Sequence, residues 1–354
     1  MGRLSRVELQ KRNRARVLDA AREEFIEHGY RDAKIDGIAE RADLTRGAVY
    51  SNFTGKRGLY FAVLAELTDS APDAHQEPGR TPGEALASLA RAWFSRLAAG
   101  QDSPLGMNLM SEILADERTR RPFAQLMKLD AILLGFALEQ LRPAGRMVRV
   151  AETVLTMLQG ASQLTAAAPG FVEPFNVARA CEQLASLDLA DQWARPPSTP
   201  PVRPDNEPWT PPPAIDAVSG QPARLAEDGV VAILGLNRLA AAEDVVRTAP
   251  AEAQVTAVLV TGDPSELAPL ARLVVAELCG CLRQAFPPSA WPRLQVIHEE
   301  SGMLAAAAGV TDFSDGTEAA VRIEAGRIVA RADGFGACHA AAAVDLSATS
   351  ANLH

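Results

Sequence analysis

The chain has 354 residues, of which 47% are apolar, so it is long enough for two or three domains with buried cores. It contains no run of 18 apolar residues and begins with charged residues, so we expect neither a membrane-spanning helix nor a signal peptide. Its net charge of −9 is uneven: residues 1–60 carry 13 Lys and Arg against 9 Asp and Glu, and residues 61–354 carry 22 against 35, so only the N-terminal end should attract phosphate.

A basic first helix is predicted over residues 11–28. Its apolar stripe has helical spacing and consists of Val17, Leu18, Ala21 and Phe25. Basic residues cluster at its start, where cations oppose the helix dipole and are not placed for helix stability. We therefore predict an arm, including Arg12 and Arg14, that contacts the DNA backbone or the minor groove. An ordinary solvated face is the alternative.

Two short helices, 34–41 and 45–52, are predicted on either side of a tight turn at residues 42–44. This pattern is typical of a helix-turn-helix whose second helix enters a DNA groove. Thr45 is a plausible N-cap, because its hydroxyl can accept a hydrogen bond from the next turn. Val49 and Phe53 are four residues apart, so both should face the domain core.

The other side of this second helix carries the candidate DNA contacts. Arg46 and Gly47 lie in its first turn, where recognition helices meet base edges. Tyr50 and Ser51 should project away from the core. For Tyr50 we expect a phosphate contact through the hydroxyl, with a role as a rim aromatic as the alternative.

Residues 38–60 combine core and polar residues in a definite order. The order is Ile38-Ala39-Glu40-Arg41-Ala42, then Thr45-Arg46-Gly47-Ala48-Val49-Tyr50-Ser51-Asn52-Phe53, then Lys56 and Leu59-Tyr60. It resembles the DNA-binding domain of the TetR family of bacterial transcriptional regulators, over residues 11–60. By that resemblance Thr45, Arg46, Tyr50 and Lys56 occupy DNA-contact positions, and Lys56 grips phosphate at the start of a fourth helix.

The chain departs from the family pattern at two places. Asp43 stands where the family usually has Gly in the turn, and Asp is among the few side chains that tolerate a left-handed backbone. Ala33 and Lys34 stand where the second helix usually opens with Thr. Lys34 would replace that phosphate contact with a charge.

Five helical patterns follow and predict an all-α body, at residues 83–99, 104–115, 118–141, 146–167 and 174–190. The last two have clean apolar stripes, which fit either an intra-domain core or a contact with a second copy. In the TetR family the last two helices usually dimerise. A homodimer on a palindromic double-stranded DNA operator is therefore expected, since two heads must meet two half-sites.

The family resemblance also implies a pocket for a small-molecule effector inside this helical body. The candidate lining residues are Trp93, Phe94, Met107, Met110, Phe123, Met127 and Met157. Met and aromatic residues at helical spacing are also typical of an ordinary core.

Residues 195–213 include nine prolines in nineteen residues. This composition predicts an extended, semi-rigid spacer without folded structure, with a PxxP-type docking site as the alternative. The predicted domains are a helix-turn-helix domain at 11–71, a ligand-binding and dimerisation domain at 72–194, a proline-rich linker at 195–224 and a C-terminal domain at 225–346.

In the C-terminal domain, short apolar runs alternate with helical patterns, and Ala325-Gly326 marks a hairpin. This predicts a parallel α/β sheet with an antiparallel edge. The order of elements resembles the thioredoxin-like fold, and locally its peroxiredoxin-type members. No cysteine occupies the start of the helices after the first two strands, where thiol chemistry needs one. Cys279, Cys281 and Cys338 are instead expected to be small buried hydrophobes, without metal or cofactor.

The overall expectation is a multi-domain cytoplasmic protein. An all-α TetR-like part is followed by an α/β thioredoxin-like domain, and four irregularly spaced cysteines favour a reducing compartment. The predicted function is that of a dimeric, effector-released repressor without enzyme activity. The alternatives are a redox-linked regulator or thiol oxidoreductase, and a scaffold whose C-terminal domain recruits a partner.

Overall fold

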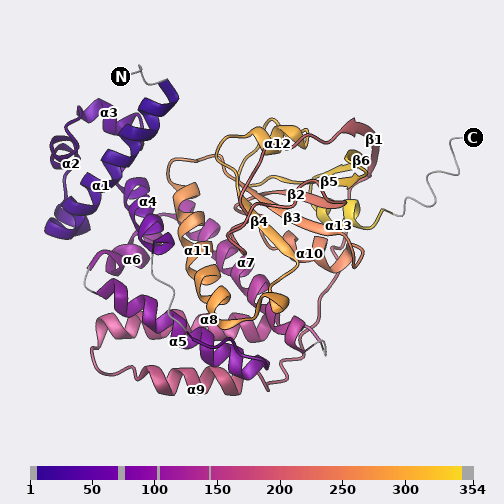
Figure 1. Ribbon diagram of the computed structural model, residues 1–354, viewed down its shortest axis with the longest axis horizontal. Coiled ribbons are helices and arrows are strands. Elements are labelled where there is room, and N and C mark those ends of the chain that lie inside the picture. The colour runs from indigo at the N-terminus through magenta and orange to yellow at the C-terminus, as the bar shows by residue number, and fades with distance from the viewer. Residues whose placement is uncertain (1–5, 71–75, 102–103, 143–144, 345–354) are drawn as a thin grey trace, which may run out of the picture.

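The computed structural model describes residues 6–70, 76–101, 104–142 and 145–344 (Figure 1). The N-terminal head contains α1 (Arg6–Asp32), α2 (Ile35–Arg41), α3 (Arg46–Tyr50) and the start of α4 (Lys56–Asp69). The four helices confirm the predicted pattern. Gly29 interrupts α1 with φ 70°, which glycine tolerates without steric cost, and Asp43 takes the left-handed conformation in the turn at φ 50°.

The helical body confirms the five predicted helical segments, with shifted ends. It comprises α5 (Pro82–Gln101), the 3-10 turn η1 (Pro104–Asn108), α6 (Leu109–Leu114), α7 (Glu117–Leu141), α8 (Val148–Ala167) and α9 (Pro174–Leu184). Helix α9 ends six residues before the predicted end, where hydrogen bonds of the 3-10 type turn the chain at Ser186 and Leu187. Within the described ranges, no helix is long and apolar enough to cross a membrane.

A six-stranded mixed sheet forms the C-terminal half. Its strands are β1 (Arg203–Pro208), β2 (Gly229–Gly235), β3 (Gln254–Val260), β4 (Leu294–His298), β5 (Glu318–Glu324) and β6 (Arg327–Asp333), in the spatial order β1-β6-β5-β2-β3-β4. Strands β2, β3 and β4 are parallel, whereas β5 and β6 are antiparallel. The predicted parallel sheet with an antiparallel edge is therefore confirmed. The thioredoxin-like assignment stays a prediction.

The longest described helix of this half is α11 (Leu267–Ala285). The others are α10 (Ala241–Thr248), the 3-10 turn η2 (Pro288–Ala290), α12 (Met303–Ala307) and α13 (Ala337–Ala342). Helices α10, α11 and α13 pack in the same core as one face of the sheet, and α12 packs in the core of the other face. Strands β2 and β3 are buried along their whole length, as expected for strands covered on both faces.

The proline-rich segment contradicts the prediction of an unfolded spacer. Its residues 203–208 form β1, which pairs with β6 at the edge of the sheet. Trp209 follows and is buried, with its indole N–H donating to the Leu225 carbonyl at 2.7 Å. Proline is tolerated here because β1 is an edge strand, which has a neighbouring strand on one side only. An N–H that proline lacks on the open side removes no hydrogen bond of the sheet.

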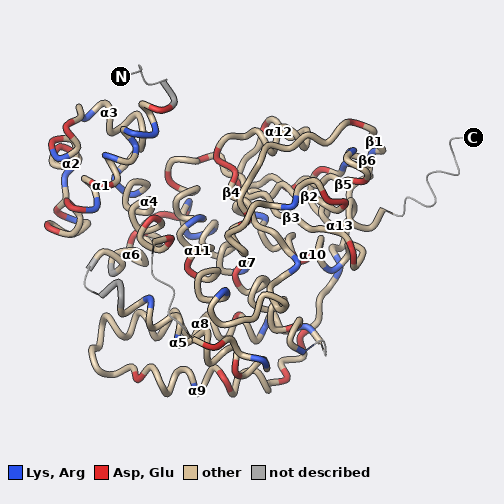
Figure 2. The backbone as a smooth tube through the Cα atoms, in the orientation of Figure 1, with Lys and Arg blue, Asp and Glu red and all other residues tan. Residues whose placement is uncertain are grey.

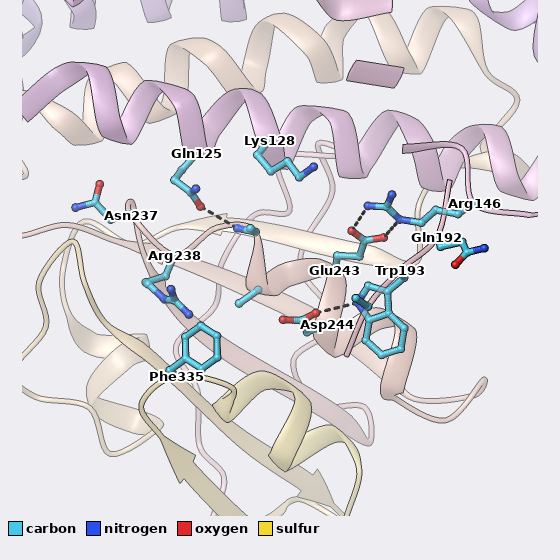
Figure 3. A pocket seen from close by; sticks show the side chains of 13 residues that line it. Gln125, Lys128, Arg146, Gln192, Trp193, Asn237, Arg238, Glu243, Asp244 and Phe335 are labelled. Carbon is cyan, nitrogen blue, oxygen red and sulfur yellow. Dashed lines mark hydrogen bonds and ion pairs between the residues drawn. The ribbon is translucent and has the colours of Figure 1, made fainter. Parts of the chain in front are cut away.

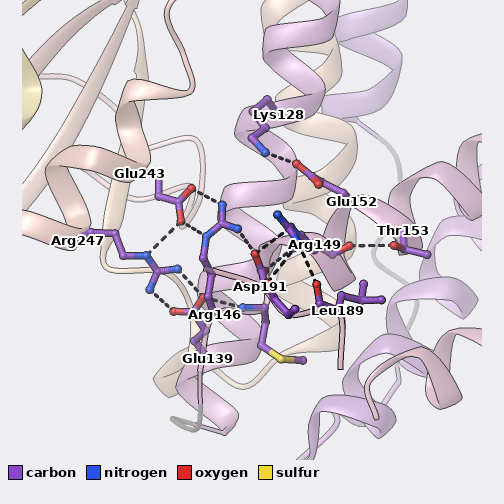
Figure 4. Close-up of polar contacts among 12 residues, drawn as sticks. Lys128, Glu139, Arg146, Arg149, Glu152, Thr153, Leu189, Asp191, Glu243 and Arg247 are labelled. Carbon is purple, nitrogen blue, oxygen red and sulfur yellow. Dashed lines mark hydrogen bonds and ion pairs between the residues drawn. The ribbon is translucent and has the colours of Figure 1, made fainter. Parts of the chain in front are cut away.

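The helical body and the sheet share one hydrophobic core, which also extends into the head. Helix α11 lies between the sheet and the body and packs on α4, α5 and α7 (Figure 1). Ion pairs reinforce this junction: Arg146 binds Glu243 at 2.6 Å, and Arg247 binds Glu139 at 2.6 Å (Figure 4). The C-terminal half is therefore packed against the N-terminal half rather than tethered to it.

Candidate nucleic-acid interface

Helix α3 presents one face to the core and the other to solvent. Val49 and Phe53 are buried, whereas Tyr50 is 40% exposed, as predicted from their spacing. The N-cap of α3 is Thr45, whose Oγ1 accepts from the Ala48 N–H at 3.2 Å. Because this hydroxyl holds the first turn, Thr45 fixes the start of α3 and with it the direction of the exposed face.

The side chain of Arg46 lies on that exposed face and is oriented by two neighbouring side chains. Its guanidinium lies 3.3 Å from Asp36 Oδ1 and 3.5 Å from the Tyr50 hydroxyl, with Cζ 5.6 Å from the centre of the Tyr50 ring. Tyr50 and then Asp36 raise the pKa of Arg46. These contacts limit the rotamers of a long side chain that remains 60% exposed, so Arg46 needs little ordering to meet a base edge or a phosphate.

The basic start of α1 is divided between internal and exposed roles. Arg14 donates to the Asn52 carbonyl at 3.4 Å and stacks 4.4 Å over Phe53, which ties α1 to the end of α3. Arg16 binds the turn residue Asp43 at 3.2 Å. Arg12 is exposed. Figure 2 shows both signs of charge along α1 and α2, so any attraction to phosphate depends on where individual cations lie.

Lys56 has a structural role at the start of α4. Its ammonium donates to the Arg31 carbonyl at 2.9 Å and the Ala33 carbonyl at 2.8 Å, and lies 4.8 Å from the Tyr30 ring centre. Burial lowers the pKa of Lys56. Since an ammonium has three N–H donors, one remains for a phosphate while two hold the end of α1.

The other predicted contact residues differ in accessibility. Lys34 and Gly47 are exposed beside α2 and α3. Ser51 is exposed too, but its hydroxyl donates to the Ala48 carbonyl at 2.8 Å. A DNA contact by Ser51 would therefore use its oxygen as an acceptor or replace an existing hydrogen bond.

The sequence did not predict a role for Glu24, whose carboxylate on α1 binds both ends of α2. It is buried on α1, and its carboxylate accepts from the Lys34 backbone N–H at 3.2 Å and from Arg41 Nε at 2.9 Å. Burial acts to raise the pKa of Glu24, but these two hydrogen bonds and the nearby charges of His28 and Arg41 together lower the pKa. A Cβ on Gly37 would lie 2.7 Å from Glu24 Oε1, so glycine lets α2 approach this carboxylate.

The predicted effector-pocket residues lie in the core of the helical body. Trp93 and Phe94 are buried, and the Trp93 indole N–H donates to Ser162 Oγ at 2.8 Å. The partly buried members that pack against this core are Met110, Phe123, Met127 and Met157. The side chain of Met107 lies outside the described part of the chain. A pocket formed by these residues stays a prediction.

The four cysteines are buried and form no disulfide bond. Burial raises the pKa of the Cys181 thiol to about 11 and also raises the pKa values of Cys279 and Cys338. A nucleophilic thiolate is therefore disfavoured at neutral pH. Among the described residues, no group of three or more His, Cys, Asp or Glu is arranged to hold a metal ion.

Comparison with known proteins gives the same assignment for the head. Residues 17–63 match the family model described as "Bacterial regulatory proteins, tetR family". The chain is 51% identical over 55 residues to the uncharacterized regulator TtgW of Pseudomonas putida, covering 16% of this chain and 41% of TtgW. It is 32% identical over 114 residues to TtgR of the same species, covering 30% and 46%.

The match to these relatives is confined to the N-terminal part, and the chain spans less than half of the length of either. A TetR transcriptional regulator from Rhodococcus sp. RHA1 superimposes with a TM-score of 0.36 and 20% identity, over 51% of this chain and 99% of the other. The N-terminal head of this protein is a helix-turn-helix domain of the TetR family type.

Proposed function

We propose that the protein is a sequence-specific DNA-binding transcriptional regulator that inserts α3 into the major groove. The observation that carries this proposal is the exposed face of α3, where Arg46 is oriented by contacts with Tyr50 and Asp36. The opposite face is fixed in the core through Val49. A rigid helix with an oriented, exposed arginine suits base readout, in which Arg pairs with guanine.

In this proposal the remaining contacts are to the DNA backbone. Tyr50 and Lys34 are exposed and would bind phosphate, together with Arg12. Lys56 would offer its third N–H to a phosphate while keeping its two carbonyl partners. Arg14 supports the interface from inside, because its guanidinium is held by Asn52 and Phe53.

We further propose that the protein acts as a homodimer through α8 and α9. Large apolar side chains are exposed along these helices and the connection between them: Leu164 is 44% exposed, Phe171 72% and Phe175 69%. Clustered exposed apolar side chains mark a protein interface more often than a free surface. A two-fold dimer would present two heads to a palindromic operator.

Repression released by a small-molecule effector is the proposed mode of regulation. Specific binding requires both heads to fit half-sites at a fixed spacing, so a ligand that changes this spacing weakens binding. The close packing of the head on the body through Tyr30, which donates to Glu112 Oε2 at 2.9 Å, supports such a connection.

The test is selection of DNA from a genomic library by the purified protein, followed by binding measurements on the selected site. Arg46→Ala should weaken binding by about 1–3 kcal/mol and relax specificity. Arg203→Ala is the matched control, because Arg203 is also an exposed, ion-paired arginine but lies on β1. If Arg46→Ala binds the selected site as tightly as the native protein, the assignment of α3 as the reading helix is wrong.

A further inference from the structure

A polar cavity lies at the junction of the helical body and the sheet (Figure 3). Its volume is about 310 Å³. Gln125 and Lys128 of α7 form one wall, and Asn237 and Arg238, which follow β2, form the opposite wall. The cavity therefore opens at the carboxyl end of a parallel strand, the edge of an open α/β sheet where ligands characteristically bind.

Hydrogen-bonding capacity that remains unused in this cavity consists mainly of donors. Among the residues that the structure describes, Lys128 pairs with Glu152 alone and so retains two N–H groups. Arg238 binds Glu318 through Nε and Nη2, and Gln125 accepts from the Ala240 N–H at 3.1 Å. Within the described residues, Arg238 Nη1 and the Gln125 amide nitrogen have no hydrogen-bond acceptor.

The carboxylates of the cavity are already engaged. Glu243 is buried and receives both Arg146 and Arg247. Asp244 accepts from the Trp193 indole N–H at 2.9 Å, and burial raises its pKa. The lining thus offers free donors to a ligand, and Asn237 Oδ1 is a buried acceptor that has no partner among the described residues.

An aromatic surface completes the cavity. The Phe335 ring is 52% exposed and lies under Arg238, whose Cζ is 4.8 Å from the ring centre. The Trp193 ring lies on the other side of the lining, beside Asp244 (Figure 3). A volume near 300 Å³ is at the small end of ligand pockets, so the geometry favours a compact molecule with an apolar body.

We propose that this cavity binds a small organic anion. Its charged group would lie between Lys128 and Arg238, and its apolar body would rest on Phe335. We also propose that binding is communicated to the DNA-binding head. The communication to the head affects regulation only if the proposed DNA-binding function is correct. The contacts that support the communication do not involve DNA.

A chain of hydrogen bonds leaves the cavity along the carboxyl ends of β2 and β3. The Asn237 N–H donates to the Asp315 carbonyl at 2.8 Å, and Asp315 Oδ1 accepts from Thr261 Oγ1 at 2.6 Å. Thr261 Oγ1 accepts from the Asp263 N–H at 3.1 Å. Asp263 Oδ1 in turn accepts from Ser265 Oγ at 2.7 Å. The loop between β3 and α11 is therefore fixed to the cavity wall.

The same loop contacts the head where α4 begins. Ser265 Oγ lies 2.5 Å from Thr54 Oγ1, and Glu266 binds Arg57 at 2.5 Å. Arg57 also binds Asp116 at 2.9 Å, so one guanidinium joins head, body and C-terminal half. A Cβ on Gly58 would lie 2.3 Å from the Ser265 carbonyl oxygen, which shows how closely the loop and α4 approach each other.

The first test measures binding to the full-length protein, with benzoate as the probe and inorganic phosphate as the anion without an apolar body. Calorimetry should show saturable binding of benzoate, tighter than that of phosphate. Lys128→Met and Phe335→Ala should each weaken it by about tenfold. Arg118→Met is the control, since Arg118 is an exposed cation on the same helix and should leave binding unchanged.

The second test follows the head without DNA. Bound benzoate should slow amide hydrogen exchange at residues 54–59, and Thr261→Val should abolish that effect while leaving benzoate bound. Absence of saturable benzoate binding, or binding unaffected by both cavity variants, would overturn the proposed site. Slowed exchange that persists in Thr261→Val would overturn the proposed connection. Neither measurement uses DNA. A failure of the cavity proposal can therefore be distinguished from a failure of the proposed DNA-binding function, which the Arg46→Ala variant tests.

Discussion

Two acidic side chains lie at the packing surface between α7 and α11, and their protonation should make stability depend on pH. Asp130 of α7 is buried, and its Oδ1 has no hydrogen-bond partner. Burial raises the pKa of Glu277 on α11 to about 7, with Arg96 acting in the opposite direction. Burial and the nearby Glu277 also raise the pKa of Asp130. Replacing Glu277 with Gln removes one titration and keeps the shape of the side chain.

The expected magnitude follows from the two pKa values of Glu277. The folded chain binds this proton with a pKa of about 7, against 4.5 for an ordinary glutamate. Stability from this group is therefore fully present below pH 4.5 and is lost as the pH rises to 7. Between pH 5 and pH 8 the loss has an upper limit of about 2.5 kcal/mol. Because Glu277 retains partial exposure, we expect about 1–2 kcal/mol.

The assay is urea unfolding at pH 5, 6, 7 and 8, followed by circular dichroism at one protein concentration. The free energy of unfolding of Glu277→Gln, relative to the native chain, should rise by about 1–2 kcal/mol from pH 5 to pH 8. Glu252→Gln is the control, because Glu252 is exposed, and its difference from the native chain should stay flat. Parallel pH profiles for Glu277→Gln and the native chain would refute the reasoning.

Three further predictions concern the head and the dimer. Gly37→Ala should destabilise the head by about 1–3 kcal/mol, because the Cβ of the alanine would lie 2.7 Å from the Glu24 carboxylate. Unchanged thermal unfolding would argue against this close approach. Lys56→Ala should weaken binding to all DNA sequences alike and reduce the slope of the log binding constant against log salt concentration by about one. It should also lower stability, because two hydrogen bonds to backbone carbonyls are lost. An effect on one sequence alone would contradict a phosphate contact. Phe175→Ser should raise the dimer dissociation constant in analytical ultracentrifugation, whereas Ile215→Ser, also at an exposed apolar residue, should not.

The helix-turn-helix could be predicted because its determinants are local. Thr45 caps α3 from within the same turn, Asp43 supplies the left-handed conformation, and the spacing of Val49 and Phe53 sets the inward face. Each of these interactions joins residues a few positions apart, where residue type and spacing specify the geometry. The strands and the hairpin at Ala325 were predictable for the same reason, with φ 47° at Ala325 in the turn.

Contacts between distant segments could not be predicted in this way. The proline-rich segment becomes β1 because β6, more than 100 residues later, supplies its hydrogen-bond partners. Glu24 gains its role only when α1 brings it beneath Lys34 and Gly37. The composition of the proline-rich segment indicates an extended chain, but not whether a partner strand will pair with it.

The sequence alone determined the type of the head, the helical nature of the body and the alternation of strands and helices beyond it. Only the tertiary structure decided that these parts share one core, with α11 packed between the sheet and the body. Only that packing brings Glu266 to Arg57 and places a cavity between α7 and the end of β2. The physical reason is that hydrophobic burial is non-directional. The spacing of apolar residues shows which face of a helix or strand is buried, but only the complete fold determines which other element that face packs against.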